Sequence, residues 1–190
     1  MVQQQKEKIG GIILAGGKSS RMGQDKALLD FQGKRLIDYA IDLLSPICSG
    51  LLISVNQPGY EQFGFEIVAD HFKGCGPIGG LHAALRASKY DWNLVVSCDT
   101  PFLSQKLFDL LLQSKDGCQA VIPKHENGVE PLVALYHKNL GGFLEQKILQ
   151  GDFKLQKLIR EQKVNFLDVS DLLNDHPNLF NNLNSPADMA

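Results

Sequence analysis

The segment LAGGKSSRMGQDK, residues 14–26, combines three glycines with positively charged side chains directly after an apolar run. Glycine readily adopts positive φ, which lets successive backbone N–H groups point at one anion. Lys18, Arg21 and Lys26 add positive charge to the same loop. A flexible surface loop with solvated charges is the alternative, but the position directly after the first expected strand favours a phosphate-binding loop.

A P-loop would require the motif GxxxxGK[ST], and Gly17, Lys18 and Ser19 supply only its end. The first glycine of that motif should stand at position 12, which is Ile12 in an expected strand interior. We therefore set the P-loop aside.

The segment GCGPIG, residues 74–79, formally satisfies the dinucleotide motif GxGxxG. Residues 70–73 nevertheless separate it from the preceding strand, and Pro77 has no N–H to donate. We expect a ligand-facing turn or a helix-entry loop here rather than a site for NAD or FAD.

Two aspartates follow apolar strand-like runs. Asp99 ends the run in VVSCDTP, where its carboxylate is either a cap for nearby backbone or a metal ligand. Mg²⁺ is commonly held by one or two carboxylates together with substrate phosphates, so we favour Mg²⁺ at Asp99 beside the cationic loop. Asp70 ends an earlier run, where it suits a contact with a ribose or a metal and equally suits capping of the following loop. His71 and His82 lack ligand spacing and are expected to be surface or core histidines.

Apolar runs alternate with helical patterns along the chain, which predicts a parallel sheet covered by helices. Strands are expected at 9–14, 50–56, 65–70, 91–99, 118–123, 129–137 and 164–169. Helices are expected at 36–45, 76–88, 105–114, 141–149 and 153–161, with Ser104 as an N-cap. Ligands in such sheets bind outside the carboxyl ends of the strands. The first four strands end at Gly16, Asn56, Asp70 and Asp99, so these residues are predicted to line one crevice.

The composition predicts an ordinary globular protein with a single domain over 1–190. The chain has 190 residues, 44% hydrophobic and 21% charged, with a net charge of −2, so no nucleic-acid partner is expected. Four scattered cysteines, Cys48, Cys75, Cys98 and Cys118, predict reduced thiols rather than a disulfide or a metal site. The short, glycine-interrupted apolar stretch at the N-terminus predicts neither a signal peptide nor a membrane span, and we expect a cytoplasmic protein.

The opening motif resembles the LAGGxSxRMGxDK signature of nucleotidyltransferases that act on cofactors and sugars. The blocks GPIGGL, CDTPF, EPLVALYH and NLNSPAD follow at residues 76–81, 98–102, 130–137 and 182–188. In this order they resemble the molybdenum cofactor guanylyltransferases, and the similarity extends over nearly the whole chain.

This resemblance implies a three-layer α/β/α fold with a Rossmann-like, mostly parallel sheet of the nucleotide-diphospho-sugar transferase type. It implies transfer of GMP from GTP to the terminal phosphate of molybdopterin, with release of pyrophosphate. The residues that match the GTP-binding positions of the family are Leu14, Ala15, Gly16, Lys26, Asn56, Asp70 and Asp99. Asp99 also matches the Mg²⁺ ligand, and Asn182 and Asn184 match pterin-side positions.

Catalytic roles are expected for Arg21, Lys26 and Asp99, because positive charge and Mg²⁺ would stabilise the charge that develops on the phosphates. The expected partners are GTP and molybdopterin, with transient contacts to other proteins of molybdenum-cofactor synthesis, and we expect a monomer without a membrane partner. Two alternatives stay open: a related cytidylyltransferase or sugar-phosphate nucleotidyltransferase, and a nucleotide-binding module without catalysis.

Overall fold

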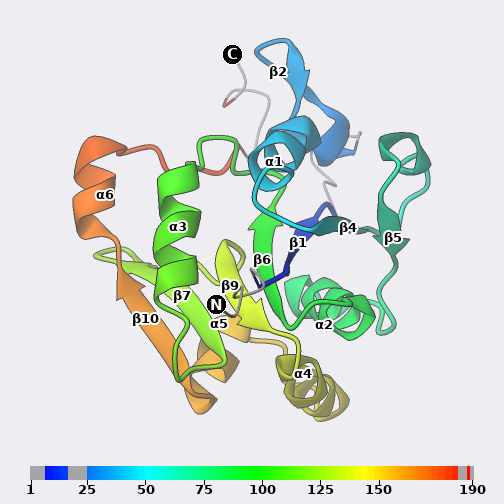
Figure 1. Ribbon diagram of the computed structural model, residues 1–190. Coiled ribbons are helices and arrows are strands. Elements are labelled where there is room, and N and C mark those ends of the chain that lie inside the picture. The colour runs from blue at the N-terminus through cyan, green and yellow to red at the C-terminus, as the bar shows by residue number, and fades with distance from the viewer. Residues whose placement is uncertain (1–6, 17–24, 184–187, 189–190) are drawn as a thin grey trace, which may run out of the picture.

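The computed structural model describes residues 7–16, 25–183 and 188. Its centre is a mixed sheet in the order β10-β7-β9-β6-β1-β4-β5, with β8 attached to β7 (Figure 1). The strands are β1 (Ile9–Leu14), β4 (Gly50–Ser54), β5 (Glu66–Val68), β6 (Trp92–Ser97), β7 (Ala120–His125), β8 (Gly128–Val129), β9 (Ala134–His137) and β10 (Val164–Asp168).

The direction of the strands confirms a mostly parallel sheet. β5, β4, β1 and β6 run parallel, and β10 runs parallel to β7. β9 is antiparallel to both of its neighbours, β6 and β7. The strand expected over 129–137 is divided into β8 and β9, and Pro131, which lacks an N–H for a sheet ladder, lies between them.

Helices cover both faces of the sheet. One face carries α1 (Leu36–Leu44), α3 (Gln105–Gln113) and α6 (Ser170–Asp175), and the other carries α2 (Pro77–Ala87), α4 (Leu140–Leu149) and α5 (Leu155–Leu158). Side chains of a strand alternate between the two faces, so Ile13 packs in the first core while Ile12 and Leu14 pack in the second. This arrangement confirms the predicted α/β/α layers.

Shorter elements complete the chain. They are the 3-10 helices η1 (Lys26–Leu28), η2 (Glu61–Phe63) and η3 (Ile159–Glu161) and a hairpin of β2 (Asp30–Phe31) and β3 (Lys34–Arg35). The hairpin turns through Gln32 and Gly33, both at positive φ.

Two local predictions differ from the structure. Ser104 is the N-cap residue of α3, as predicted, but its buried hydroxyl makes no hydrogen bond among the described residues, so the side-chain bond expected of such a cap is absent. Helix α6 was not predicted, because its six residues are too few for a clear helical pattern. The four cysteines are free, and no helix in the described part of the chain is long and apolar enough to cross a membrane.

Candidate active site

The four predicted crevice residues each stand two positions beyond the end of a strand. Leu14 is level with Ser54 and with Ser97, and Ser54 is level with Val68, so the ends of β6, β1, β4 and β5 form one edge. The corresponding residues follow in the spatial order Asp99, Gly16, Asn56 and Asp70.

The width of the sheet separates the two aspartates of this edge. Neighbouring strands lie about 4.8 Å apart, so the axes of β5 and β6, three steps apart, are separated by about 14 Å. An edge of this width suits an elongated ligand.

Asp99 joins the end of β6 to the residue that closes the glycine-rich loop. Its Oδ2 lies 2.8 Å from Lys26 Nζ, and the two side chains are 20% and 18% exposed. The hydroxyl of Ser97 donates to Asp99 Oδ1 at 2.5 Å. Lys26 is held by η1, which begins where the Asp25 carboxylate accepts the N–H of Ala27 at 3.2 Å. The predicted juxtaposition of Lys26 and Asp99 is therefore present.

The backbone around Asp99 is fixed from three sides. Thr100 Oγ1 donates to the Ser97 carbonyl at 2.8 Å, and the N–H of Cys98 donates to the Leu14 carbonyl at 3.2 Å. The N–H of Leu183 donates to the Asp99 carbonyl at 3.0 Å. This last contact was not predicted, because nothing in either segment indicates a bond between residues so far apart in the sequence.

The thiol beside the carboxylate is not a nucleophile. Burial, with a further effect of the neighbouring Asp99 charge, raises the pKa of Cys98 well above its usual range. Cys98 therefore stays protonated at neutral pH.

The donor set at Asp99 fits a magnesium ion that completes its coordination with substrate oxygens. Within the described residues, no group of three or more His, Cys, Asp or Glu side chains is arranged to hold a metal by itself. One carboxylate with access to solvent is what Mg²⁺ uses when phosphates and water supply its other ligands.

Asn56 and Asp70 are joined to each other at the far side of the edge. Asn56 Oδ1 accepts the N–H of Asp70 at 2.9 Å. The Asp70 carboxylate lies against the first turns of α2, where a Cβ on Gly79 or Gly80 would be 3.3 or 3.5 Å from its oxygens. The amino end of a helix stabilises a carboxylate. Both roles considered for Asp70, a cap for the following loop and a contact with a ligand, stay predictions.

The remaining predicted residues lie at the end of β1 or in the loop. Leu14 and Ala15 are buried, and the N–H of Ala15 donates to the Ser54 carbonyl at 3.0 Å, while Gly16 is exposed. Arg21 falls within residues 17–24, which lie outside the described residues, so its role stays a prediction.

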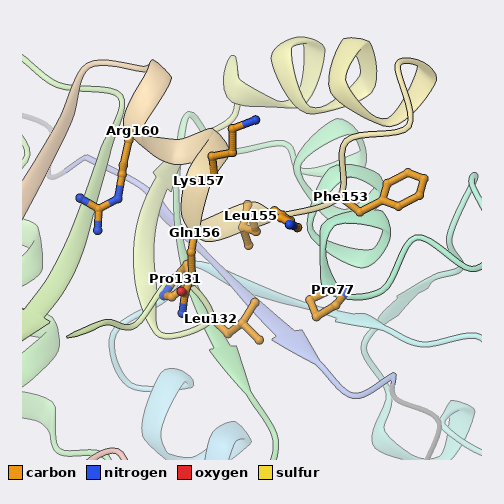
Figure 2. Close-up of a pocket in the computed structure, with 9 residues that line it drawn as sticks. Pro77, Pro131, Leu132, Phe153, Leu155, Gln156, Lys157 and Arg160 are labelled. Carbon is orange, nitrogen blue, oxygen red and sulfur yellow. The ribbon is translucent and has the colours of Figure 1, made fainter. Parts of the chain in front are cut away.

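A cavity of about 660 Å³ opens beside the amino end of α2. Figure 2 shows Leu155 and Gln156 extending from α5 towards Pro131 and Leu132. The lining is mainly apolar, and Lys154, Lys157 and Arg160 add positive charge. Because α2 follows β5 and Leu132 precedes the antiparallel β9, the cavity opens at the same edge of the sheet as Asp99.

The fold and the site together define an α/β protein of the nucleotidyltransferase class, with a glycine-rich loop and an aspartate at the carboxyl edge of one sheet. The chain matches the family described as "MobA-like NTP transferase domain" over residues 11–166. The chain therefore belongs to the MobA-like NTP transferase family.

Individual relatives agree with this membership. The chain is 37% identical over 184 residues to the molybdenum cofactor guanylyltransferase of Vibrio parahaemolyticus, covering 94% of this chain and 92% of that protein. It is 30% identical to the molybdopterin-guanine dinucleotide biosynthesis protein A of Archaeoglobus fulgidus, whose crystal structure matches with a TM-score of 0.80 over 95% of this chain and 94% of that one. A Mycobacterium tuberculosis protein crystallised with manganese shares the fold at 18% identity and a TM-score of 0.66, covering 91% of this chain and 98% of that one.

Proposed function

We propose that this protein transfers GMP from GTP to the terminal phosphate of molybdopterin and releases pyrophosphate. The observation that carries the proposal is the pairing of Lys26 with Asp99 at 2.8 Å, which places the last residue of the glycine-rich motif beside the end of β6. The similarity to guanylyltransferases over almost the whole chain supports guanine as the base and molybdopterin as the acceptor.

The proposed reaction is a displacement at the α-phosphorus of GTP. An oxygen of the acceptor phosphate forms a bond to that phosphorus, and the bond to the bridging oxygen of pyrophosphate breaks. The nucleophile is already anionic, so the reaction needs no strong general base. Lys26, Arg21 and backbone N–H groups of the loop would stabilise the charge on the phosphates. Lys26 would then exchange its contact with Asp99 for one with a phosphate oxygen.

Asp99 is the proposed ligand for Mg²⁺, which supplies positive charge to the phosphates when it is bound. Ser97 donates to Oδ1 of this carboxylate at 2.5 Å and so helps to fix its orientation. At the other end of the edge, Asn56 and Asp70 follow β4 and β5, the second and third strands from β6, which suits contacts with the base or the ribose.

The cavity beside α5 is the proposed location of the pterin. A volume of about 660 Å³ is in the range of small-molecule sites, and its apolar lining suits a fused heteroaromatic ring. Lys154 and Arg160 would provide positive charge for an anionic ligand. We extend the proposal to a monomeric enzyme of the cytoplasm, where four free cysteines remain reduced.

The test measures binding of each nucleoside triphosphate, and pyrophosphate release from it with Mg²⁺, in the presence of molybdopterin, of a sugar phosphate, or of neither. We expect release from GTP only when molybdopterin is present. Release that requires CTP and molybdopterin would instead identify a cytidylyltransferase, and release that requires a sugar phosphate would identify the other alternative enzyme. Binding of GTP without any release would indicate a nucleotide-binding module.

A further inference from the structure

His125, the last residue of β7, contacts two other segments at the carboxyl edge. Its Nε2 lies 3.0 Å from Glu130 Oε1, and its ring stacks on Phe180 with centroids 5.4 Å apart and planes inclined by 10°. The imidazole is 9% exposed, so both contacts are largely shielded from water. The N–H of Asn127 donates to His125 Nδ1 at 3.3 Å, which makes Nε2 the nitrogen that donates its proton to Glu130.

Residues 180–183, called the bridge here, connect the ring stack at His125 to Asp99. Leu183, three residues after Phe180, donates its N–H to the Asp99 carbonyl at 3.0 Å. Three residues span at most about 10 to 11 Å. The ends of β7 and β6 are about 10 Å apart, because β9 lies between them. The bridge of residues 180–183 is thus long enough to pass over the start of β9, and it carries the exposed Asn181 and Asn182.

The bond to Glu130 fixes the loop that precedes β9. Glu130 is followed by Pro131 and Leu132, which line the cavity beside α5. The buried hydroxyl of Tyr136 also donates to the Pro131 carbonyl at 2.8 Å. His125 therefore connects one wall of the cavity to the bridge that ends at Asp99.

We propose that His125 is a positioning residue for the acceptor substrate. Its imidazole holds the loop 130–132 and the bridge 180–183 in one relative arrangement, and so fixes the space between the cavity and the bridge in which the acceptor would lie. His125 does not touch the reacting atoms. The inference rests on the proposed function, because it assumes that the acceptor lies between these two segments.

Three substitutions separate the two contacts of this histidine. His125→Ala removes both, His125→Phe keeps an aromatic ring against Phe180, and His125→Gln keeps a donor for Glu130. For His125→Ala we expect the KM for molybdopterin to rise about three- to tenfold, as loss of an aromatic pair implies, with an unchanged Kd for GTP. For His125→Phe and His125→Gln, which each keep one contact, we expect a KM for molybdopterin between the values of the wild type and of His125→Ala. Hydrogen exchange at the Leu183 amide should be faster in His125→Ala, because the bridge is no longer held at Phe180.

His137 offers a matched control at the opposite edge of the sheet. It makes an edge-on contact with Trp92, with ring centroids 5.1 Å apart, so His137→Ala removes a comparable contact far from the cavity. It should leave the KM for molybdopterin and the exchange at Leu183 unchanged.

Three results would overturn the role of His125 while leaving the proposed function intact. The first is a wild-type KM for molybdopterin in His125→Ala, and the second is an equal loss of affinity for GTP, which would indicate a general structural defect. The third is an unchanged exchange rate at Leu183 in His125→Ala, which would show that the bridge is held without His125. A wild-type protein that releases no pyrophosphate with molybdopterin would instead contradict the proposed function itself, and the inference would fail with it.

Discussion

Lys26 and Asp99 are 73 residues apart in the sequence, yet Lys26 Nζ donates to Asp99 Oδ2 at 2.8 Å. Each side chain is about one-fifth exposed, so a ligand that enters at the carboxyl edge can reach both. A lysine that neutralises a carboxylate here is also placed to bind a phosphate, and the carboxylate is then available to a cation.

Asp99→Asn should abolish most of the turnover without unfolding the protein. The amide keeps the size of the side chain but removes the negative charge proposed to hold Mg²⁺, so kcat should fall by about 10²- to 10³-fold. A partly exposed ion pair contributes at most about 1 kcal/mol, so the melting temperature should change little.

Asp91→Asn is the matched control for that substitution. Asp91 precedes the other end of β6 and pairs with Lys138 at 2.8 Å on the surface. It should retain wild-type kcat. Equal activity of the Asp99→Asn and Asp91→Asn variants would show that the carboxylate at the carboxyl edge has no role in turnover.

Lys26→Met should lower kcat/KM for GTP by about 100-fold, because it removes a positive charge proposed to contact the triphosphate. Lys106→Met, which breaks a surface ion pair of 3.4 Å with Asp175, serves as the control. In the double variant with Asp99→Asn, the loss should be smaller than the product of the two single losses, because the two groups act on one substrate. Fully multiplicative losses would argue that they act independently.

Gly80→Ala should destabilise the protein by about 1–3 kcal/mol in urea unfolding. A Cβ at this position would lie 2.9 Å from Ser54 Oγ and 3.5 Å from Asp70 Oδ1, so the start of α2 would have to move. Gly142, in α4, has no heavy atom within 4 Å of an added Cβ. Gly142→Ala should therefore stabilise the protein by about 0.5–1 kcal/mol. A Gly80→Ala variant as stable as the wild-type protein would contradict the close packing at α2.

The stability should fall as the pH drops below about 6.5, and His82 should account for part of the fall. Its side chain is 1% exposed, and neither ring nitrogen has a hydrogen-bond partner among the described residues. Burial lowers the pKa of His82. The unfolded chain therefore takes up a proton at a higher pH than the folded chain, which favours unfolding by at most about 1.4 kcal/mol per pH unit.

His82→Leu should flatten this dependence in unfolding measurements between pH 5 and 7, about the range in which an ordinary histidine titrates. The exposed His176 is the control, and His176→Leu should keep the wild-type slope. If the free energy of unfolding of His82→Leu depends on pH as strongly as that of the wild type, other groups cause the effect.

The positions of the strands and of the chemical groups at their ends were predictable from the sequence. Continuous apolar runs identified buried strands, and β1 occupies the predicted residues 9–14. Asn56, Asp70 and Asp99 follow such runs, so parallel strands had to bring them to one edge. The same reasoning excluded the P-loop, because Ile12 lies inside β1 and is fully buried.

Contacts between distant segments were not predictable in this way. The bond from Leu183 to Asp99 and the contacts of His125 with Glu130 and Phe180 depend on how the chain crosses the finished sheet. The sequence around a histidine at the end of a strand is the same whether its ring is exposed to solvent or stacked on another ring. At Ser104 the sequence predicted the N-cap position of α3, but the side-chain hydrogen bond expected there is absent.

The most direct test of the proposed function follows the α-phosphate of GTP. The protein is incubated with Mg²⁺, molybdopterin and GTP labelled at either the α- or the γ-phosphate, and the products are separated. We predict that the α-label appears in a dinucleotide with the pterin and that the γ-label appears in pyrophosphate. Transfer of the γ-label to the pterin, or no labelled pterin product at all, would contradict guanylyl transfer.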